Sequence, residues 1–422
     1  IVTCLLCVQL LRGAGPHLSC TMSGMAQRAW LLALLAAAAC DKGPEQVPYI
    51  DVPIPETAVE VNGPNAFGAY ANLAERAAGR AKLPIDARDT ARNREKALRE
   101  MGPLLPELAS ATLLPCTFLF EPVGPFDERP HEIGWLHLGR AIVLRVEQAV
   151  EEGDWDAAVH WTVVGTCFGA DLCGGAVSDA TLGYGVMDGV RRAMAPHVAG
   201  LPSLALDALV VGIERALRRV PDPSVTISHE SALMMTAIRD LQAAHESGEV
   251  EAFAKRLYGE SREAARSFGK LQGAQRSVFV QSLFDCATRV TAMLGEQANV
   301  PGLERSPIAL GLVGPAATIG EQFFTAGPAW FGVRDLTIAR TRLLYLTAFV
   351  CQRLRSTGAA PGDLGEATEG LNVDPFTGLP LGYIPLGQDF VVYSYGADGK
   401  DDRGDSDAER MRPDLLLEEA AL

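Results

Sequence analysis

Features that mark several common classes of protein are missing from this sequence of 422 residues. No apolar run reaches the roughly 18 to 20 residues that a helix needs to cross a bilayer. Nine cysteines in 422 residues are too few for a disulfide scaffold, and the absence of paired C-x-x-C motifs excludes a zinc module of that type. Basic residues number 37 against 52 acidic ones, and a net charge of −15 argues against a concentrated basic face. We therefore expect no nucleic-acid partner.

Apolar residues, by contrast, are plentiful. They make up 48% of the chain, which is enough for a sizeable buried core and excludes wholesale disorder. A chain of this length favours two or three domains rather than one.

The N-terminal region has the layout of a secretory signal. The chain begins at Ile1 rather than at a methionine, and Met25 is the alternative start. Arg28 then supplies a basic residue, and an apolar stretch from Ala29 to Ala39 precedes Cys40. This stretch is too short for a membrane-spanning helix and has the length of the apolar part of a signal peptide.

The residues Ala37-Ala38-Ala39-Cys40 resemble the bacterial lipobox, in which the cysteine becomes the lipidated first residue of the mature protein. The resemblance implies that residues 1–39 are a lipoprotein signal region and that Cys40 is lipidated. Each buried CH₂ of the acyl chains would contribute about 0.8 kcal/mol to membrane binding. The protein would then be anchored in the bacterial cell envelope, facing the periplasm or the cell exterior. An ordinary secreted protein and an unprocessed chain are the alternatives.

Composition divides the rest of the chain into four parts. Residues 40–65 carry prolines at positions 44, 48, 53, 55 and 64, which predicts an extended tether. Residues 66–332 form the predicted helical domain. Residues 333–410 combine a further helix with a turn-rich and acidic segment, and residues 411–422 are a tail.

From about residue 66 onward, apolar residues recur with the 3.6-residue period of a helix. We expect Gly153 to end one helix and Asp154 to cap the next, and Ser228 to cap a later helix. Other long helices are expected over residues 88–101, 203–220 and 333–355. The segment from Thr117 to Phe120 is the one candidate strand before residue 380. Helices joined by short loops predict a mainly α fold, a multi-helix bundle or an irregular helical array.

The C-terminal part changes from helical to turn-rich sequence. Asp374-Pro375-Phe376 is followed by Pro380, by Gly387 at a predicted hairpin turn and by Tyr393-Ser394-Tyr395-Gly396-Ala397-Asp398-Gly399. Residues 334–409 resemble the C-terminal segment of the major pseudopilin of type II secretion systems. The resemblance implies a helical stem followed by a small β-hairpin module and an acidic loop.

The sequence departs from the pseudopilin pattern in two respects. One extra residue stands between Phe376 and Pro380, and the hydrophobic N-terminal stem with its prepilin cleavage site is absent. We therefore expect that this chain does not polymerise as a pilin does. The whole layout also resembles bacterial lipoproteins of the cell envelope, a resemblance that implies a location without an activity.

In pseudopilins the acidic loop binds calcium, and the resemblance carries that role to Asp398, Asp401, Asp402, Asp405 and Asp407. Ca²⁺ takes about six to eight oxygen ligands, which closely spaced carboxylates and turn carbonyls can supply. The EF-hand pattern is not met, because Lys400 and Arg403 fall where ligands should stand. Apart from this possible calcium ion, the sequence indicates no cofactor. The alternative to a calcium site is a solvated acidic tail.

Three short motifs suggest chemistry, and each has a simpler structural interpretation. His131 and His137 stand six residues apart, whereas a helical zinc site needs histidines four residues apart. Ser267 and Lys270 fit S-x-x-K but lack the partner motifs of the β-lactamase class. The segment Gly183–Gly189 has one residue too many for a dinucleotide fingerprint, and close helix packing explains its glycines better.

No coherent catalytic constellation emerges, so the sequence favours a non-enzymatic role. We expect a lipid-anchored envelope protein that acts as a helical interaction scaffold, with another envelope protein as its partner. One alternative is a hydrolase whose residues come from scattered loops, with His160, Asp171 and Glu230 as candidates. Another alternative is an accessory protein of a secretion apparatus, which rests on the C-terminal resemblance alone.

Overall fold

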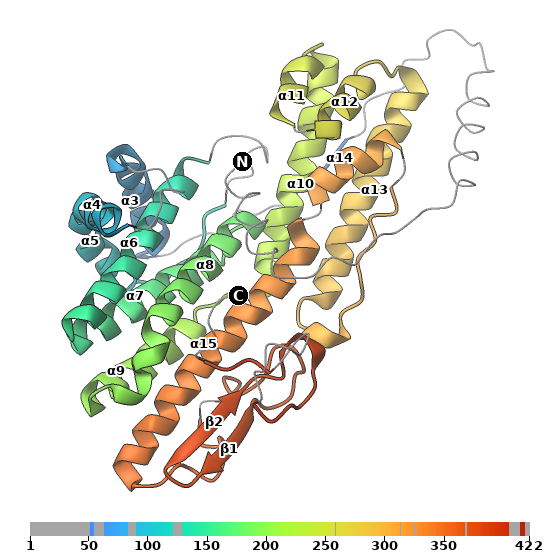
Figure 1. The fold of residues 1–422 in the computed structure, drawn as a ribbon. Coiled ribbons are helices and arrows are strands. Elements are labelled where there is room, and N and C mark those ends of the chain that lie inside the picture. Colours follow the sequence, from blue (N-terminus) through green and yellow to red (C-terminus); the bar gives the residue numbers. More distant parts are fainter. Residues whose placement is uncertain are drawn as a thin grey trace.

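A computed structural model describes residues 51–54, 63–82, 90–120, 129–257, 259–312, 314–324, 326–367, 369–404 and 414–417. The predicted signal region, Cys40, Asp405 and Asp407 lie outside the described residues. Within those ranges the fold is mainly α with a small antiparallel hairpin near the C-terminus, as the sequence predicts (Figure 1). None of the described helices has both the length and the apolarity needed to cross a membrane.

The centre of the fold is a set of long helices that lie side by side (Figure 1). They are α6 (Pro130–Glu152), α7 (Trp155–Leu172), α8 (Val177–Met194), α9 (Ser203–Leu217) and α15 (Ala326–Thr357). Helix α7 contacts α6, α8 and α9, and α15 packs along α8 and α9. The short 3-10 helix η2 (Ala195–Gly200) connects α8 to α9. Helix α15 runs across the predicted boundary between residues 332 and 333.

The turn between α6 and α7 follows from two adjacent residues. Gly153 has a left-handed φ of 70°, which glycine adopts without a steric penalty, and it ends α6. The Asp154 side chain accepts a hydrogen bond from the Ala157 backbone N–H at 3.1 Å and caps α7. Both predictions for this junction are confirmed.

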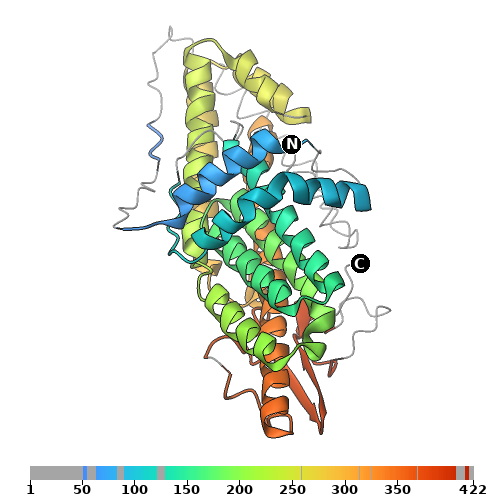
Figure 2. The same cartoon turned by 90° about the vertical axis from the view of Figure 1, so that its left-hand side faces the viewer.

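Shorter helices cover the α6 side of the bundle (Figure 2). They are α3 (Ala66–Arg80), α4 (Ala91–Met101), the 3-10 helix η1 (Gly102–Leu104) and α5 (Leu105–Ala111). The helix predicted over residues 88–101 corresponds to α4. The strand predicted from Thr117 to Phe120 is wrong, since this segment has no strand partner among the described residues. Instead, the Asn65 side chain donates to the Thr117 carbonyl and accepts from the Thr117 N–H.

A second group of helices continues from the bundle through α10 (Figure 1). Its members are α10 (Pro223–Glu246), α11 (Val250–Arg256), α12 (Gly259–Phe268), α13 (Gly273–Gln297) and α14 (Pro315–Phe324). Helix α10 begins earlier than predicted, and Ser228 lies inside it rather than at its cap. Asp222 accepts a hydrogen bond from the Ser224 N–H at 2.8 Å, and Pro223 occupies the first helical position. This pair is a stronger helix start than Ser228 alone.

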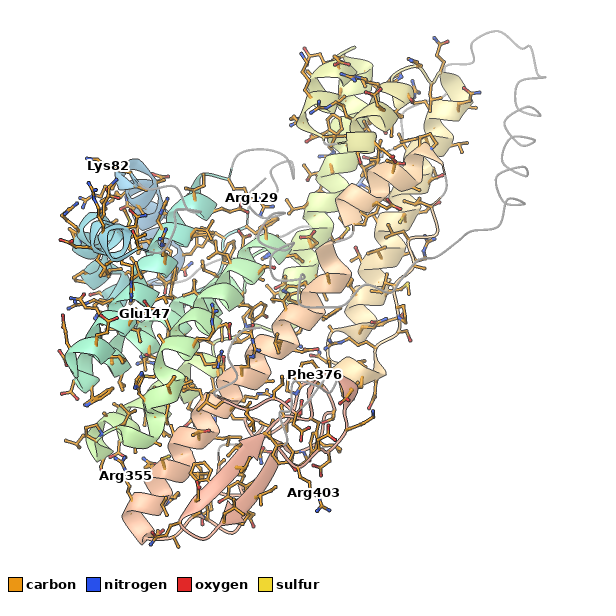
Figure 3. All side chains as sticks on the ribbon, viewed as in Figure 1. Lys82, Arg129, Glu147, Arg355, Phe376 and Arg403 are labelled. Carbon is orange, nitrogen blue, oxygen red and sulfur yellow. The ribbon has the colours of Figure 1, made fainter. Side chains whose placement is uncertain are left out.

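The C-terminal module packs against α15 (Figure 1). Strand β1 (Gly382–Leu386) pairs antiparallel with β2 (Asp389–Tyr393), and Gly387 has a φ of 80° at the predicted turn. The 3-10 helix η3 (Gly302–Glu304) contacts both α15 and the 3-10 helix η4 (Gly396–Asp398). Figure 3 labels Phe376 and Arg403 in this module.

Small residues let the central helices approach closely. A Cβ added to Gly183 of α8 would lie 2.3 Å from the carbonyl oxygen of Gly169 in α7. A Cβ added to Gly189 would lie 2.7 Å from the Val143 side chain of α6. These contacts favour the packing interpretation of the segment Gly183–Gly189 over a dinucleotide site.

Candidate functional site

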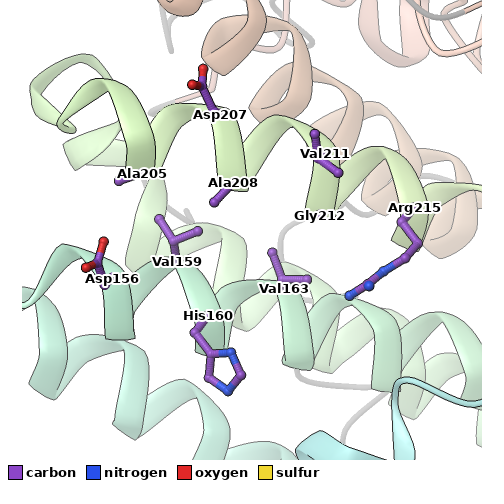
Figure 4. A pocket seen from close by; sticks show the side chains of 10 residues that line it. All are labelled: Asp156, Val159, His160, Val163, Ala205, Asp207, Ala208, Val211, Gly212 and Arg215. Carbon is purple, nitrogen blue, oxygen red and sulfur yellow. The ribbon is translucent and has the colours of Figure 1, made fainter.

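An open hollow of about 570 Å³ lies between α7 and α9 (Figure 4). Helix α7 lines it with Asp156, Val159, His160 and Val163. Helix α9 lines it with Ala205, Asp207, Ala208, Val211, Gly212 and Arg215. We call the surface formed by these ten residues the α7–α9 groove.

The two helices meet at the floor of the groove because α9 carries a glycine there. A Cβ added to Gly212 would lie 2.2 Å from Cγ2 of Val163 in α7. The core face of α9 is fixed by Leu206, Leu209 and Ile213, which are fully buried. The side of α9 that points away from this core face therefore remains at the surface.

Apolar side chains stay exposed along this side of α9. Leu204 is 82% exposed and Val211 is 66% exposed, and their spacing of seven residues places them on one face. Leu113, at 69% exposure, lines a second hollow of about 200 Å³ that shares three lining residues with the first. Exposed apolar side chains that share one face of a helix are candidates for contact with a partner.

Charged side chains stand at the two ends of the α7–α9 groove (Figure 4). Asp156 lies at the end where both helices begin, Arg215 lies at the opposite end, and Asp207 points from α9 away from α7. Asp207 also accepts a hydrogen bond from the Gln352 amide of α15 at 2.7 Å. The groove therefore runs from an acidic end through an apolar middle to a basic end.

His160 lines both hollows. Partial burial of the ring lowers the pKa of His160, which favours the neutral imidazole. Ser110 also lines the second hollow, and its hydroxyl donates to the Pro106 carbonyl at 3.0 Å. A neutral imidazole among apolar walls suits the binding of an apolar side chain.

Of the three residues predicted for a hydrolase, only His160 lines the α7–α9 groove. Asp171 is eleven residues further along α7, about 16 Å away along the helix axis. Its buried carboxylate accepts hydrogen bonds from the Tyr70 hydroxyl at 2.7 Å and from the Arg219 guanidinium at 2.6 Å. Burial raises the pKa of Asp171, and the Arg219 guanidinium opposes that rise. The two hydrogen bonds of the carboxylate join α3, α7 and the turn that follows α9.

Glu230 belongs to a different buried group at the start of α8. The Glu230 carboxylate accepts a hydrogen bond from the Val177 N–H at 3.1 Å. The Asp179 carboxylate accepts one from the Ala176 N–H at 3.0 Å. Arg129, at the start of α6, donates to Asp179 at 3.3 Å (Figure 3). Burial raises the pKa of Asp179 to about 7 despite Arg129, and it also raises the pKa of Glu230. Both carboxylates satisfy backbone N–H groups at the start of a helix, which is a structural role.

Three aspartates of the predicted calcium loop are described: Asp398, Asp401 and Asp402. Asp398 accepts a hydrogen bond from a backbone amide, and Asp401 accepts one from the Tyr393 hydroxyl at 2.7 Å. Over the described ranges, no three His, Cys, Asp or Glu side chains come together as ligands for a metal ion. Asp405 and Asp407 lie outside those ranges, so the calcium site stays a prediction.

The remaining motifs take up local positions in the fold. His131 lies on α6 with its ring centroid 5.4 Å from that of Trp135. His137 lies on the same helix, and burial lowers its pKa. Ser267 is near the end of α12, and the Lys270 N–H donates to the Ser267 carbonyl in the turn that follows.

The groove side of α9 is the feature that the sequence analysis misses. Leu206, Leu209 and Ile213 mark only the buried side of this helix. The overlooked signal is a second apolar stripe at i, i+4 and i+7, formed by Leu204, Ala208 and Val211. This stripe lies about 180° around the helix from the core stripe.

The chain matches no protein-family model, no curated protein and no solved structure. The groove combines apolar walls with an acidic and a basic end, a chemistry that can receive the apolar face of a partner.

Proposed function

We propose that this protein is a lipid-anchored envelope protein that acts as a helical interaction scaffold, with the α7–α9 groove as its binding face. The observation that carries the proposal is the exposed apolar pair Leu204 and Val211 beside a groove with mostly apolar walls. Removing such surface from water favours association by about 25 cal/mol per Å². A groove of this kind accepts the apolar face of a partner, and its charged ends fix the partner's direction.

The lipid anchor rests on the lipobox-like residues that end at Cys40. The test is to express the full-length chain and its Cys40→Ala variant in a Gram-negative bacterium with labelled palmitate. We expect the unaltered chain to incorporate the label and to sediment with membranes, and the variant to do neither. Cys116→Ala is the matched control and should behave like the unaltered chain. Equal labelling of the Cys40→Ala variant would contradict the anchor.

The binding face is tested by site-specific photo-crosslinking in intact cells. A photoreactive amino acid replaces Val211 in the full-length chain, and in a control chain it replaces Val278, an exposed apolar residue of α13. We expect a discrete protein adduct from position 211 that is absent from position 278. No adduct at position 211, or the same adducts at both positions, would contradict the proposal.

A hydrolase is the second candidate function, because Ser110 and His160 line the same hollow. As a general base, the neutral imidazole would take the hydroxyl proton while the serine oxygen attacks the substrate carbonyl. A serine-directed fluorophosphonate probe tests this directly. Labelling that is lost in Ser110→Ala and kept in Ser356→Ala would support a hydrolase, and absence of labelling would contradict it.

A further inference from the structure

The α7–α9 groove carries a charge pattern that is complementary to itself. Asp156 stands at one end, Ala208 and Val211 lie in the apolar middle, and Arg215 stands at the other end (Figure 4). A rotation of 180° about an axis through the middle places the acidic end of one copy against the basic end of another. An interface with two-fold symmetry requires this kind of self-complementary patch.

We propose that the occupant of the α7–α9 groove is a second copy of this chain, bound antiparallel about a two-fold axis near Ala208 and Val211. The proposal names the partner of the binding face and therefore rests on the proposed interaction role. It does not depend on the lipid anchor, because the complementary residues all belong to α7 and α9.

The spacing along α9 fits an antiparallel arrangement. Leu204 and Arg215 are eleven residues apart, about 16 Å along the helix, and Ala208 and Val211 lie between them. Antiparallel pairing then sets Arg215 of one protomer against Leu204 of its partner. The apolar stem of the arginine can cover the exposed leucine while its charged head reaches the acidic end of the groove.

The charges also select the direction of pairing. In the antiparallel dimer the contact between Asp156 and Arg215 occurs twice, once on each side of the apolar middle. In a parallel pairing, acidic ends would face each other and basic ends would face each other, which is unfavourable. Both side chains are exposed, so each is available to a partner.

Charge reversal tests both the identity of the partner and its direction. Full-length chains with two different affinity tags are co-expressed and extracted in mild detergent, and co-purification of the two tags is measured. We expect Arg215→Asp to weaken self-pairing at least about tenfold, because two carboxylates then face each other at both ends. Asp156→Arg should weaken self-pairing to a similar extent, because two guanidinium groups then meet.

The two single variants should pair with each other as well as unaltered chains do, because opposite charges face each other again. The double variant Asp156→Arg/Arg215→Asp should pair with itself and fail to pair with the unaltered chain. Lys255→Asp, a charge reversal on α11, is the matched control and should leave pairing unchanged. Val211→Glu keeps both charged ends and should also abolish pairing, because it places a charge in the apolar middle.

Circular dichroism and thermal unfolding confirm that each variant is folded before pairing is scored. Unaltered chains that do not pair, or folded single variants that fail to rescue each other, would overturn the second-copy proposal. If a different protein is then crosslinked at Val211, the interaction role stands and only this inference fails. If position 211 gives no adduct, the interaction role fails as well.

Discussion

The buried carboxylate of Asp374 accepts a hydrogen bond from the Ser394 hydroxyl at 2.8 Å. The same carboxylate accepts hydrogen bonds from the backbone N–H groups of Phe376 at 2.8 Å and Tyr395 at 2.7 Å. One side chain therefore joins the turn that begins at Asp374 to the segment that follows β2. These are the two motifs on which the pseudopilin resemblance rests, and here they hold the C-terminal module together.

Replacing Asp374 should destabilise the protein strongly. Asp374→Ala leaves three hydrogen-bond donors without their acceptor, so we expect a loss of about 2 to 4 kcal/mol in the free energy of unfolding. Ser394→Ala removes one donor and should cost about 1 kcal/mol. Urea denaturation of both variants checks the prediction. A loss for Asp374→Ala no larger than that for Ser394→Ala would contradict the organising role of the carboxylate.

Two glycines of α8 should respond to alanine in opposite directions. Gly183→Ala places a Cβ 2.3 Å from a backbone carbonyl of α7, so the helices must separate, at a cost of about 2 kcal/mol or more. Gly185 has nothing within 4 Å of an added Cβ, and Gly185→Ala should stabilise α8 by about 1 kcal/mol through helix propensity. Thermal and chemical unfolding measure both effects. Changes of the same sign would contradict the close contact between α7 and α8.

Asp179 should make stability depend on pH. Its folded pKa of about 7 lies above the ordinary value of 3.8, so the folded state binds more protons than the unfolded state between these values. Stability should therefore fall as the pH rises from about 4 to 7, by at most about 1.4 kcal/mol per pH unit from this group. Asp179→Asn should reduce that slope, and the exposed control Glu246→Gln should leave it unchanged. The check is urea denaturation at several pH values; an unchanged slope in Asp179→Asn would contradict the prediction.

Calcium binding by the acidic loop remains a prediction that proteolysis can test. If the loop from Asp398 to Asp407 folds around the ion, cleavage there should be slower with Ca²⁺ than with chelator. Asp402→Asn/Asp405→Asn should remove that protection. Equal cleavage of the unaltered chain with calcium and with chelator would contradict calcium binding and favour a solvated acidic tail.

The sequence predicts well those structural features that depend on residues adjacent in the chain. Gly153 and Asp154 end one helix and start the next because a left-handed glycine and a capping carboxylate act within one turn of the chain. The hairpin turn at Gly387 is local in the same way. Local signals mislead where two of them lie close together. The sequence predicts a cap at Ser228, but α10 begins at the stronger pair, Asp222 and Pro223.

The sequence does not predict those structural features that depend on contacts between distant parts of the chain. The sequence predicts that Thr117 pairs in a strand, yet the Asn65 side chain, 52 residues away in the chain, hydrogen-bonds to its backbone. At the α7–α9 groove, Gly212 lets α9 approach Val163 of α7. Neither contact has a signature in the local sequence. The exposed stripe that contains Val211 was visible in the sequence, but its function depends on which helix lies beside it.

The most direct test of the binding face is the accessibility of position 211 in the cell envelope. Val211→Cys and the control Val278→Cys are made in the full-length chain, and maleimide labelling is compared between isolated envelopes and highly diluted detergent extracts. We predict labelling of position 211 that is at least about fivefold slower in envelopes than in the extracts, with no difference at position 278. Equal labelling of position 211 in both conditions would contradict the claim that this face is occupied.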